Sequence, residues 1–254
     1  MGIEIIKFGL DILDEVLPEG IPRSSFIIIT GLGGTGKTFL TLNIAKQFLL
    51  RGEPVIYVVF DDDPITIINM LAYLGIDVYE YVRNRNLMIV DGFSFRIRNK
   101  KGKLHISVVE EVDPQNPEQV LYTIMQLLEK LELKGKGVVI IDSLNEFLAH
   151  HDYAKVEEFI KNIRANIVKY KGILTISILH TSADKAKQLL LSIEHIVDGV
   201  IFMDKQFKDG TVVRYLVIKR VRGASHKVDR VEFILSSKGI EKFFPELKTE
   251  NLRS

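Results

Sequence analysis

Residues 26–38, FIIITGLGGTGKT, decide the fold of this chain. The apolar run at 26–29 is followed at once by a threonine and a glycine, which predicts a strand buried on both faces, as in a parallel sheet. Beyond Thr38, apolar residues recur through residue 49 at the spacing of a helix. The stretch therefore predicts a strand, a glycine-rich loop and a helix in immediate succession.

The loop between this strand and helix matches the phosphate-binding pattern G-x-x-x-x-G-K-[ST]. Its glycines lack a Cβ, so the backbone can turn successive N–H groups toward an anion, and the positive end of the helix dipole meets the same point. Lys37 can reach the β- and γ-phosphates of a nucleotide, and the Thr38 hydroxyl can take one position on Mg²⁺. A glycine-rich turn with a surface lysine is the competing interpretation, but the pattern and its flanking elements together favour a nucleotide site. The predicted nucleotide-binding residues are Gly31, Gly33, Gly34, Thr35, Gly36, Lys37, Thr38 and Phe39.

Composition excludes several classes of protein. The 254 residues suffice for one large α/β domain or two small ones. Lys and Arg number 34 and Asp and Glu 33, so the net charge provides no overall attraction to nucleic acid or to an anionic membrane. The absence of cysteine excludes disulfides, thiolate metal sites and cysteine nucleophiles. Since no signal peptide and no apolar run of membrane-spanning length is present, we expect a soluble cytoplasmic protein.

A second apolar run, at 55–60, ends in three aspartates and a proline. Asp63 is expected to cap the helix that Pro64 begins. Asp61 and Asp62 then remain at the carboxyl end of a strand beside the phosphate loop. Ligands of open α/β sheets bind at that edge, so both are candidate functional acids.

Two more predicted strands end in polar residues. Residues 138–143, VVIIDS, end at Asp142, which is typical of the acid that holds the Mg²⁺ bound by Thr38 in phosphate-loop enzymes; a plain helix cap is the alternative. Residues 173–179 end at His180, which either senses the γ-phosphate or is a hydrogen-bonded structural histidine.

Local patterns predict the remaining elements. Asp11 is expected to cap a short helix in the lead-in segment. Residues 93–109 alternate around a basic tip at 99–103 and predict a β-hairpin; the tip is either a solvated turn or a basic finger that contacts a partner or nucleic acid. We further expect a strand at 87–90, helices at 117–133, 153–170 and 183–197, and antiparallel strands at 199–203, 212–219 and 228–235 with a turn at 208–210.

Taken jointly, these motifs resemble the single-domain KaiC-like branch of the RecA superfamily of ATPases. The resemblance covers nearly the whole chain, through GLDILDEVLPEGIPR, TGLGGTGKT, FDDDP, VVIIDS, IVDGVIF and IKRVRGASH. It implies an α/β fold with a RecA-like P-loop NTPase core: a mostly parallel twisted sheet flanked by helices, with antiparallel strands toward the C-terminus. Within a single domain spanning 1–254 we expect a lead-in at 1–25, the core at 26–204, a β-hairpin region at 205–245 and a tail at 246–254.

The resemblance also implies roles for residues outside the loop. Asp61 and Asp62 stand where the family usually has two glutamates, one of which polarises the water that attacks the γ-phosphate. Aspartate is one methylene shorter, and a carboxylate about one ångström out of place can lower a rate about a hundredfold. Arg220 and Arg222 match a basic pair that reaches the neighbouring subunit's γ-phosphate, although the family more often has lysine first; an ordinary charged edge strand is the alternative. The predicted catalytic residues are thus Lys37, Asp61, Asp62, Arg220 and Arg222, and the predicted metal-binding residues are Thr38 and Asp142.

The expected cofactors are ATP and Mg²⁺, with slow hydrolysis to ADP that controls assembly or partner binding. A catalytic group donated by a neighbour requires a homo-oligomer, and the family resemblance implies a hexameric ring. Two alternatives remain. One is a catalytically weak nucleotide-sensing module; the other is a recombinase-like DNA-binding ATPase, which the balanced charge disfavours.

Overall fold

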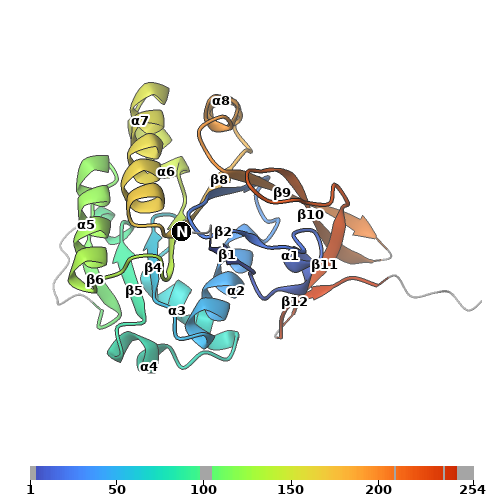
Figure 1. The fold of residues 1–254 in the computed structure, drawn as a ribbon, viewed down its shortest axis with the longest axis horizontal. Coiled ribbons are helices and arrows are strands. Elements are labelled where there is room, and N and C mark those ends of the chain that lie inside the picture. Colours follow the sequence, from blue (N-terminus) through green and yellow to red (C-terminus); the bar gives the residue numbers. More distant parts are fainter. Residues whose placement is uncertain (1–3, 98–104, 209, 237, 245–254) are drawn as a thin grey trace, which may run out of the picture.

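The structure, a computed structural model, describes residues 4–97, 105–208, 210–236 and 238–244. Ten strands form one sheet in the order β12-β11-β10-β9-β3-β8-β7-β4-β5-β6, and β1 and β2 pair separately. Helices cover both faces of the parallel part of the sheet, and the antiparallel strands extend it on one side (Figure 1). The predicted α/β class, mostly parallel with antiparallel strands toward the C-terminus, is confirmed.

The elements have the following bounds. The strands are β1 (Ile5–Ile6), β2 (Ile21–Pro22), β3 (Phe26–Gly31), β4 (Val55–Val59), β5 (Leu87–Asp91), β6 (Val108–Glu111), β7 (Val138–Asp142), β8 (Leu174–His180), β9 (Gly199–Lys208), β10 (Thr211–Val221), β11 (Val231–Ser236) and β12 (Gly239–Lys242). The helices are α1 (Asp11–Asp14), α2 (Lys37–Leu50), α3 (Pro64–Tyr73), α4 (Val78–Arg83), the 3₁₀ turn η1 (Ser94–Arg96), α5 (Pro117–Lys130), α6 (Asn145–His150), α7 (Tyr153–Ile163), the π-helical η2 (Arg164–Tyr170) and α8 (Asp184–Ile193).

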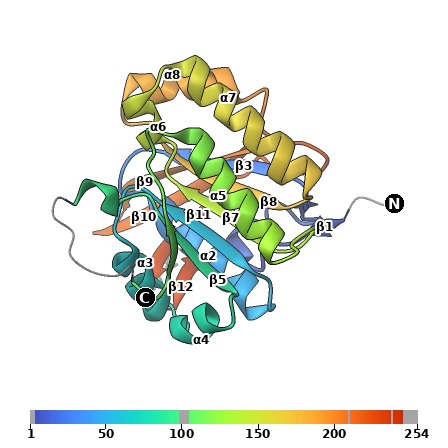
Figure 2. The same cartoon turned by 90° about the vertical axis from the view of Figure 1, so that its left-hand side faces the viewer.

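The central strands are buried on both faces, as the apolar runs predict. Strand β3 pairs in parallel with β8 and β9, and β4 pairs in parallel with β5 and β7. Every residue of β3 and β4 is buried. Because successive side chains point to opposite faces, Tyr57 and Val59 join the core under α2 and α3, whereas Ile56 and Val58 join the core under α5 and α7. Figure 2 shows α5, α7 and α8 together over the second face.

The C-terminal strands form the antiparallel side. Strand β9 is shared: it pairs in parallel with β3 through residues 199–203 and antiparallel with β10 over its whole length. It therefore continues past the carboxyl end of β3 and crosses the expected boundary between residues 204 and 205. Strands β10, β11 and β12 follow as an antiparallel series. The predicted turn at 208–210 includes Asp209, which lies outside the described residues, as does the tail at 246–254.

The expected hairpin at 93–109 is wrong in the part of it that the structure describes. The segment after β5 begins with η1, and β6 pairs in parallel with β5. The carboxylate of Asp91 accepts hydrogen bonds from the backbone N–H groups of Phe93 and Ser94, both at 2.9 Å, which turn the chain directly after the strand. The alternation of apolar and polar residues indicated extended backbone, but it did not indicate which strand that backbone pairs with. The basic tip at 99–103 lies outside the described residues.

The expected cap by Asp11 is also wrong. Leu10 occupies the cap position of α1, and Asp11 is the first helical residue. The carboxylate of Asp14 instead accepts the backbone N–H groups of Phe8 and Gly9 at 3.0 and 2.9 Å. Asp14 thus organises the turn that enters the helix.

Two further observations complete the fold. The predicted helix at 153–170 is present, but its last two turns are the π-helix η2. None of the helices in the described residues combines the length and the apolar character needed to cross a membrane.

Candidate functional site

The phosphate loop joins the carboxyl end of β3 to the first turn of α2. Gly36 occupies the cap position of α2 with φ 93°, and Gly34 has φ 72°, so both need the left-handed backbone that glycine permits. The Gly33 N–H donates to Ser182 Oγ at 3.2 Å, which ties the loop to the turn that follows β8. Since α2 begins at Lys37, its unpaired first-turn N–H groups lie at the loop, where they can bind an anion.

Lys37 is buried inside this loop. Its ammonium donates to the carbonyls of Gly31 and Leu32 at 3.0 and 2.6 Å and to Thr35 Oγ1 at 3.3 Å. Burial lowers its pKa to about 8, although the carboxylate of Asp142 raises it. The side chain is therefore still mostly protonated at neutral pH, as a phosphate ligand must be.

Asp142, at the end of β7, forms a buried network with the first turns of α2. Tyr57 donates from its hydroxyl to Oδ2 of Asp142 at 3.0 Å and lies 3.1 Å from Thr41 Oγ1. Thr38 hydrogen-bonds the same carboxylate. Burial raises the pKa of Asp142 to about 6, with Asp61 adding to the rise and the Thr38 and Tyr57 hydrogen bonds opposing it. Its Oδ1 is buried with no hydrogen-bond partner in the part of the chain described.

The two aspartates after β4 have different surroundings. Asp61 Oδ2 accepts from Ser143 Oγ at 2.6 Å and lies 3.3 Å from His180 Nε2. Burial raises the pKa of Asp61, but these two hydrogen bonds, together with electrostatic attraction to His180 and Arg96, outweigh it and leave the pKa lowered. Asp62 instead accepts the backbone N–H of Asp63 at 2.9 Å. Asp61 is therefore ionised and faces the other strand ends.

Asp63 and Pro64 have the predicted local role. The Asp63 carboxylate accepts the Thr66 N–H at 2.8 Å, and Pro64 is the first residue of α3. This cap is confirmed.

Two basic residues beside the loop were not predicted. A Cβ on Gly34 would lie 2.8 Å from Nζ of Lys205, and a Cβ on Gly36 would lie 3.5 Å from Cδ of Arg214. Lys205 and Arg214 face each other across β9 and β10. Burial lowers the pKa of Arg214, and its buried Nε has no partner among the described residues. No local motif marks either residue, because only the extension of β9 past β3 brings them to the loop.

Arg220 and Arg222 lie at the other end of these strands. Arg220 pairs with Val200 at the start of β9, whereas the loop follows Gly31 at the end of β3. Val200 is also level with Ile28, three residues before Gly31, so the two levels are about 10 Å apart at the usual rise. Arg220 donates to the Glu194 carbonyl and Arg222 to that of His195, both just after α8. The pair is thus remote from the phosphate loop of its own chain.

The residues present fit a nucleotide with its magnesium ion. The donor set is a glycine-rich loop, a helix N-terminus and an ammonium group, which together suit a polyphosphate. Asp61, Asp142 and His180 each offer a ligand atom within 4.8 Å of the others. The unpartnered Oδ1 of Asp142, beside the Thr38 hydroxyl, is the hard oxygen donor that Mg²⁺ prefers.

Comparison with known proteins agrees with this geometry. The family model described as "ATPase: KaiC" matches residues 6–246. The chain belongs to this KaiC family of ATPases. Among its KaiC-family relatives, a UPF0273 protein of Aeropyrum pernix is 29% identical over 240 residues, covering 94% of this chain and 93% of the relative. A UPF0273 protein of Thermotoga maritima is 28% identical over 239 residues, covering 94% and 95%.

A solved structure shares the fold. The crystal structure of the KaiC-like protein PH0186 from Pyrococcus horikoshii OT3 matches with a TM-score of 0.75 and 22% identity, over 95% of this chain and all of that one. KaiC-family membership confirms the resemblance seen in the motifs. It identifies the chain as a nucleotide-binding, RecA-like P-loop ATPase.

Because Asp142 is a buried charge, we expect it to lower the free energy of unfolding of the protein. The pKa of Asp142 is raised from 3.8 to about 6, so the folded state disfavours the ionised carboxylate. The resulting loss of stability is complete above about pH 6 and absent below pH 3.8, the ordinary pKa of aspartate. At pH 8, without nucleotide or magnesium, Asp142→Asn should raise the free energy of unfolding by about 1–3 kcal/mol, and the gain should shrink as the pH falls toward 4. Urea denaturation across this pH range measures it.

The matched control is Asp229→Asn, at an exposed carboxylate, which should leave stability unchanged at every pH. A destabilised Asp142→Asn protein at pH 8 would contradict the predicted penalty.

Proposed function

We propose that this protein binds MgATP at the phosphate loop, hydrolyses it slowly, and uses the nucleotide state to control its own assembly or its contacts with a partner. The observation that supports this most directly is the unpartnered, buried Oδ1 of Asp142 next to Thr38 and within reach of Lys37. A buried carboxylate with this cost is retained where a cation or a charged ligand compensates it.

The proposed roles follow from position. The loop from Gly31 to Phe39 holds the phosphates with backbone N–H groups, and Lys37 neutralises charge on the β- and γ-phosphates. Thr38 and Asp142 would hold the magnesium ion, which when bound neutralises charge on the same phosphates. Lys205 and Arg214 add two cations to the loop from the same chain.

Asp61 is the better placed of the two acids to orient water. It is ionised and faces the strand ends, whereas Asp62 is turned to its own backbone. Ser143 and His180 hold the Asp61 carboxylate near Asp142. Because aspartate is also shorter than the glutamate usual at this position, the carboxylate would lie farther from a γ-phosphate. Slow turnover is the expected consequence.

The arginine pair is proposed to act on a neighbouring protomer. Arg220 and Arg222 are remote from the loop of their own chain, so a contact with a γ-phosphate requires a second copy. A heterologous contact of this kind closes into a ring when its rotation allows, and the hexamer expected from the family is such a ring.

A nucleotide-sensing module without meaningful catalysis is the second candidate. The observation that favours it is the engagement of Asp61 with Ser143 and His180, which competes with contact to water. Such a module would be stabilised by about 2.7 kcal/mol at a hundredfold excess of nucleotide over its dissociation constant, and would release essentially no phosphate.

Removing the loop ammonium should slow turnover strongly. Lys37→Ala should release phosphate from MgATP about a hundredfold more slowly than the wild type, because an electrostatic contact to the transferred group is lost. Lys46→Ala, on the same helix but bonded to the Leu74 carbonyl, is the control and should keep wild-type turnover. Wild-type turnover no greater than that of Lys37→Ala would reject the ATPase proposal.

Lengthening the acid should separate the two candidate functions. Asp61→Glu should raise turnover, by up to about a hundredfold, if its carboxylate positions the attacking water. Asp11→Glu, at an exposed acid, should have no effect. If neither Asp61→Glu nor Asp62→Glu increases phosphate release, the water-positioning role is wrong and the sensing module is favoured.

Mixed assemblies should show whether the arginines act between protomers. Arg222→Ala keeps its own loop and Lys37→Ala keeps its arginines, so co-expressed variants should hydrolyse ATP faster than the sum of the separate variants. Native mass spectrometry verifies that both chains are in one assembly. If a verified mixed assembly hydrolyses ATP no faster than the sum of the separate variants, Arg222 does not act on the neighbouring protomer.

A further inference from the structure

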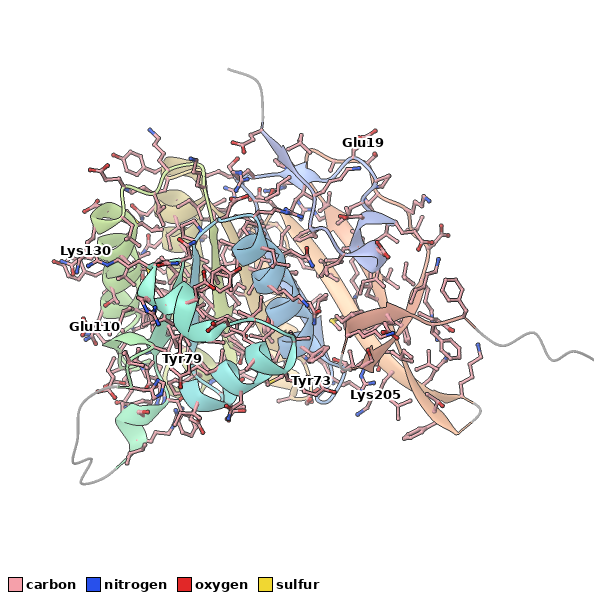
Figure 3. All side chains as sticks on the ribbon, turned by 90° about the horizontal axis from the view of Figure 1, so that it is seen from below. Glu19, Tyr73, Tyr79, Glu110, Lys130 and Lys205 are labelled. Carbon is pink, nitrogen blue, oxygen red and sulfur yellow. The ribbon has the colours of Figure 1, made fainter. Side chains whose placement is uncertain are left out.

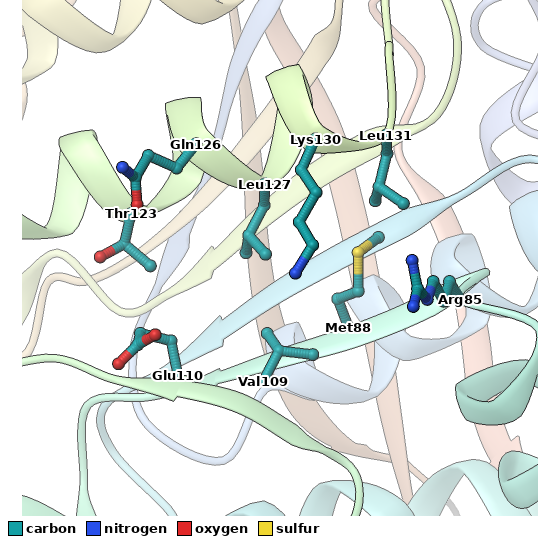
Figure 4. Close-up of a pocket in the computed structure, with 9 residues that line it drawn as sticks. All are labelled: Arg85, Met88, Val109, Glu110, Thr123, Gln126, Leu127, Lys130 and Leu131. Atoms are coloured by element: carbon teal, nitrogen blue, oxygen red, sulfur yellow. The ribbon is translucent and has the colours of Figure 1, made fainter.

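A cavity of about 300 Å³ lies between helix α5 and the sheet edge formed by β5 and β6 (Figure 4). It is far from the phosphate loop, which follows β3: four strands, β8, β7, β4 and β5, separate β3 from β6. Figure 3 shows Glu110 and Lys130, which line it, on the opposite side of the molecule from Lys205. Its volume is at the small end of the range for ligand pockets, about 300–1,000 Å³.

Charges of both signs are arranged along this cavity. The Lys130 ammonium points into its middle, beside Met88, and Arg85 lies at one end (Figure 4). Glu110 lies at the other end with Thr123. Within the described residues, the side chains of Arg85, Lys130 and Glu110 form no ion pair or side-chain hydrogen bond. Two cations and one acid therefore face the same space without partners.

Apolar and polar groups complete the lining. Met88, Val109 and Leu127 provide an apolar surface between the charged ends. At the acidic end, Gln126 donates its amide N–H to Tyr122, which leaves its carbonyl oxygen as an acceptor for a ligand. From one end of the cavity to the other, the lining is thus cationic, then apolar, then acidic.

Arg85 occupies a backbone position that would suit glycine better than arginine. Arg85 has φ 57°, in the turn after α4 that the Asn86 N–H closes on the Tyr81 carbonyl at 2.8 Å. This position at a helix end favours glycine, since a Cβ is disfavoured in left-handed backbone. Glu132 occupies the equivalent position after α5, with φ 52°, but does not line the cavity.

We propose that this cavity binds a small zwitterion of the ω-amino acid class. Its carboxylate lies between Arg85 and Lys130, its aliphatic stem lies on Val109 and Leu127, and its ammonium group is accepted by Glu110, Thr123 and Gln126. Charge complementarity at both ends selects a zwitterion over a simple acid or a simple amine. The site is independent of the nucleotide function proposed above.

The first test compares three probes of similar length by isothermal titration calorimetry: ε-aminocaproate, caproate and hexylamine. Saturable binding is expected for ε-aminocaproate, weaker binding for caproate by about ten- to a hundredfold, and none for hexylamine. Saturating MgATP should not displace ε-aminocaproate, so failure of the nucleotide proposal would not affect the result. Equal binding of caproate and ε-aminocaproate, or no saturable binding of ε-aminocaproate, overturns the proposal.

The second test uses glycine at the two equivalent helix ends. Arg85→Gly should weaken ε-aminocaproate binding about ten- to a hundredfold while keeping or raising the thermal midpoint, because glycine suits the left-handed backbone. Glu132→Gly, the matched control, should keep or raise the midpoint and leave binding unchanged. Equal affinity in Arg85→Gly and Glu132→Gly contradicts the role of Arg85.

The third test concerns the acidic end. Glu110→Gln should reduce the preference for ε-aminocaproate over caproate to near unity, since the charge that accepts the ammonium group is removed. Retention of the wild-type preference would overturn the assignment of Glu110.

Discussion

Parallel pairing of β3 with β8, and of β4 with β7, is the constraint on which the site depends. Strands buried on both faces carry mostly apolar side chains along their length, so most charged groups lie at their ends. Parallel register brings those ends to one edge of the sheet, where the phosphate loop, Asp61, Asp142 and His180 meet. Chemistry from four distant segments is thereby concentrated in one place.

Burial determines the electrostatics at this edge. Lys37 and Asp142 are both inside the protein, so the pKa of each shifts toward neutral pH. The carboxylate of Asp142 opposes the shift of Lys37, and the hydrogen bonds from Thr38 and Tyr57 oppose the shift of Asp142. One oxygen of Asp142 still lacks a partner among the described residues. These contacts hold Lys37 and Asp142 in place within the protein alone, as a preorganised site requires.

The antiparallel strands β9 and β10 place basic residues at both of their ends. Strand β9 extends beyond β3 and brings Lys205 opposite Arg214 beside the loop. Arg220 lies at the other end of the same pair of strands, and Arg222 follows directly after β10. One β-ribbon therefore supplies cations to the phosphate loop of its own chain and presents two more at the far edge, which is the arrangement that a shared site between protomers would require.

The sequence by itself determined those elements that depend only on residues close together in the chain. The motif from Gly31 to Thr38 predicted strand, loop and helix because the glycines, the lysine and the apolar spacing act within a few residues of one another. Capping by Asp63 was predicted for the same reason. Only the tertiary structure decided which segments pair: it made β6 a parallel partner of β5 and brought Lys205, Arg214 and Tyr57 to the site. Pairing partners and register depend on contacts between residues far apart in the chain, and no short pattern encodes those contacts.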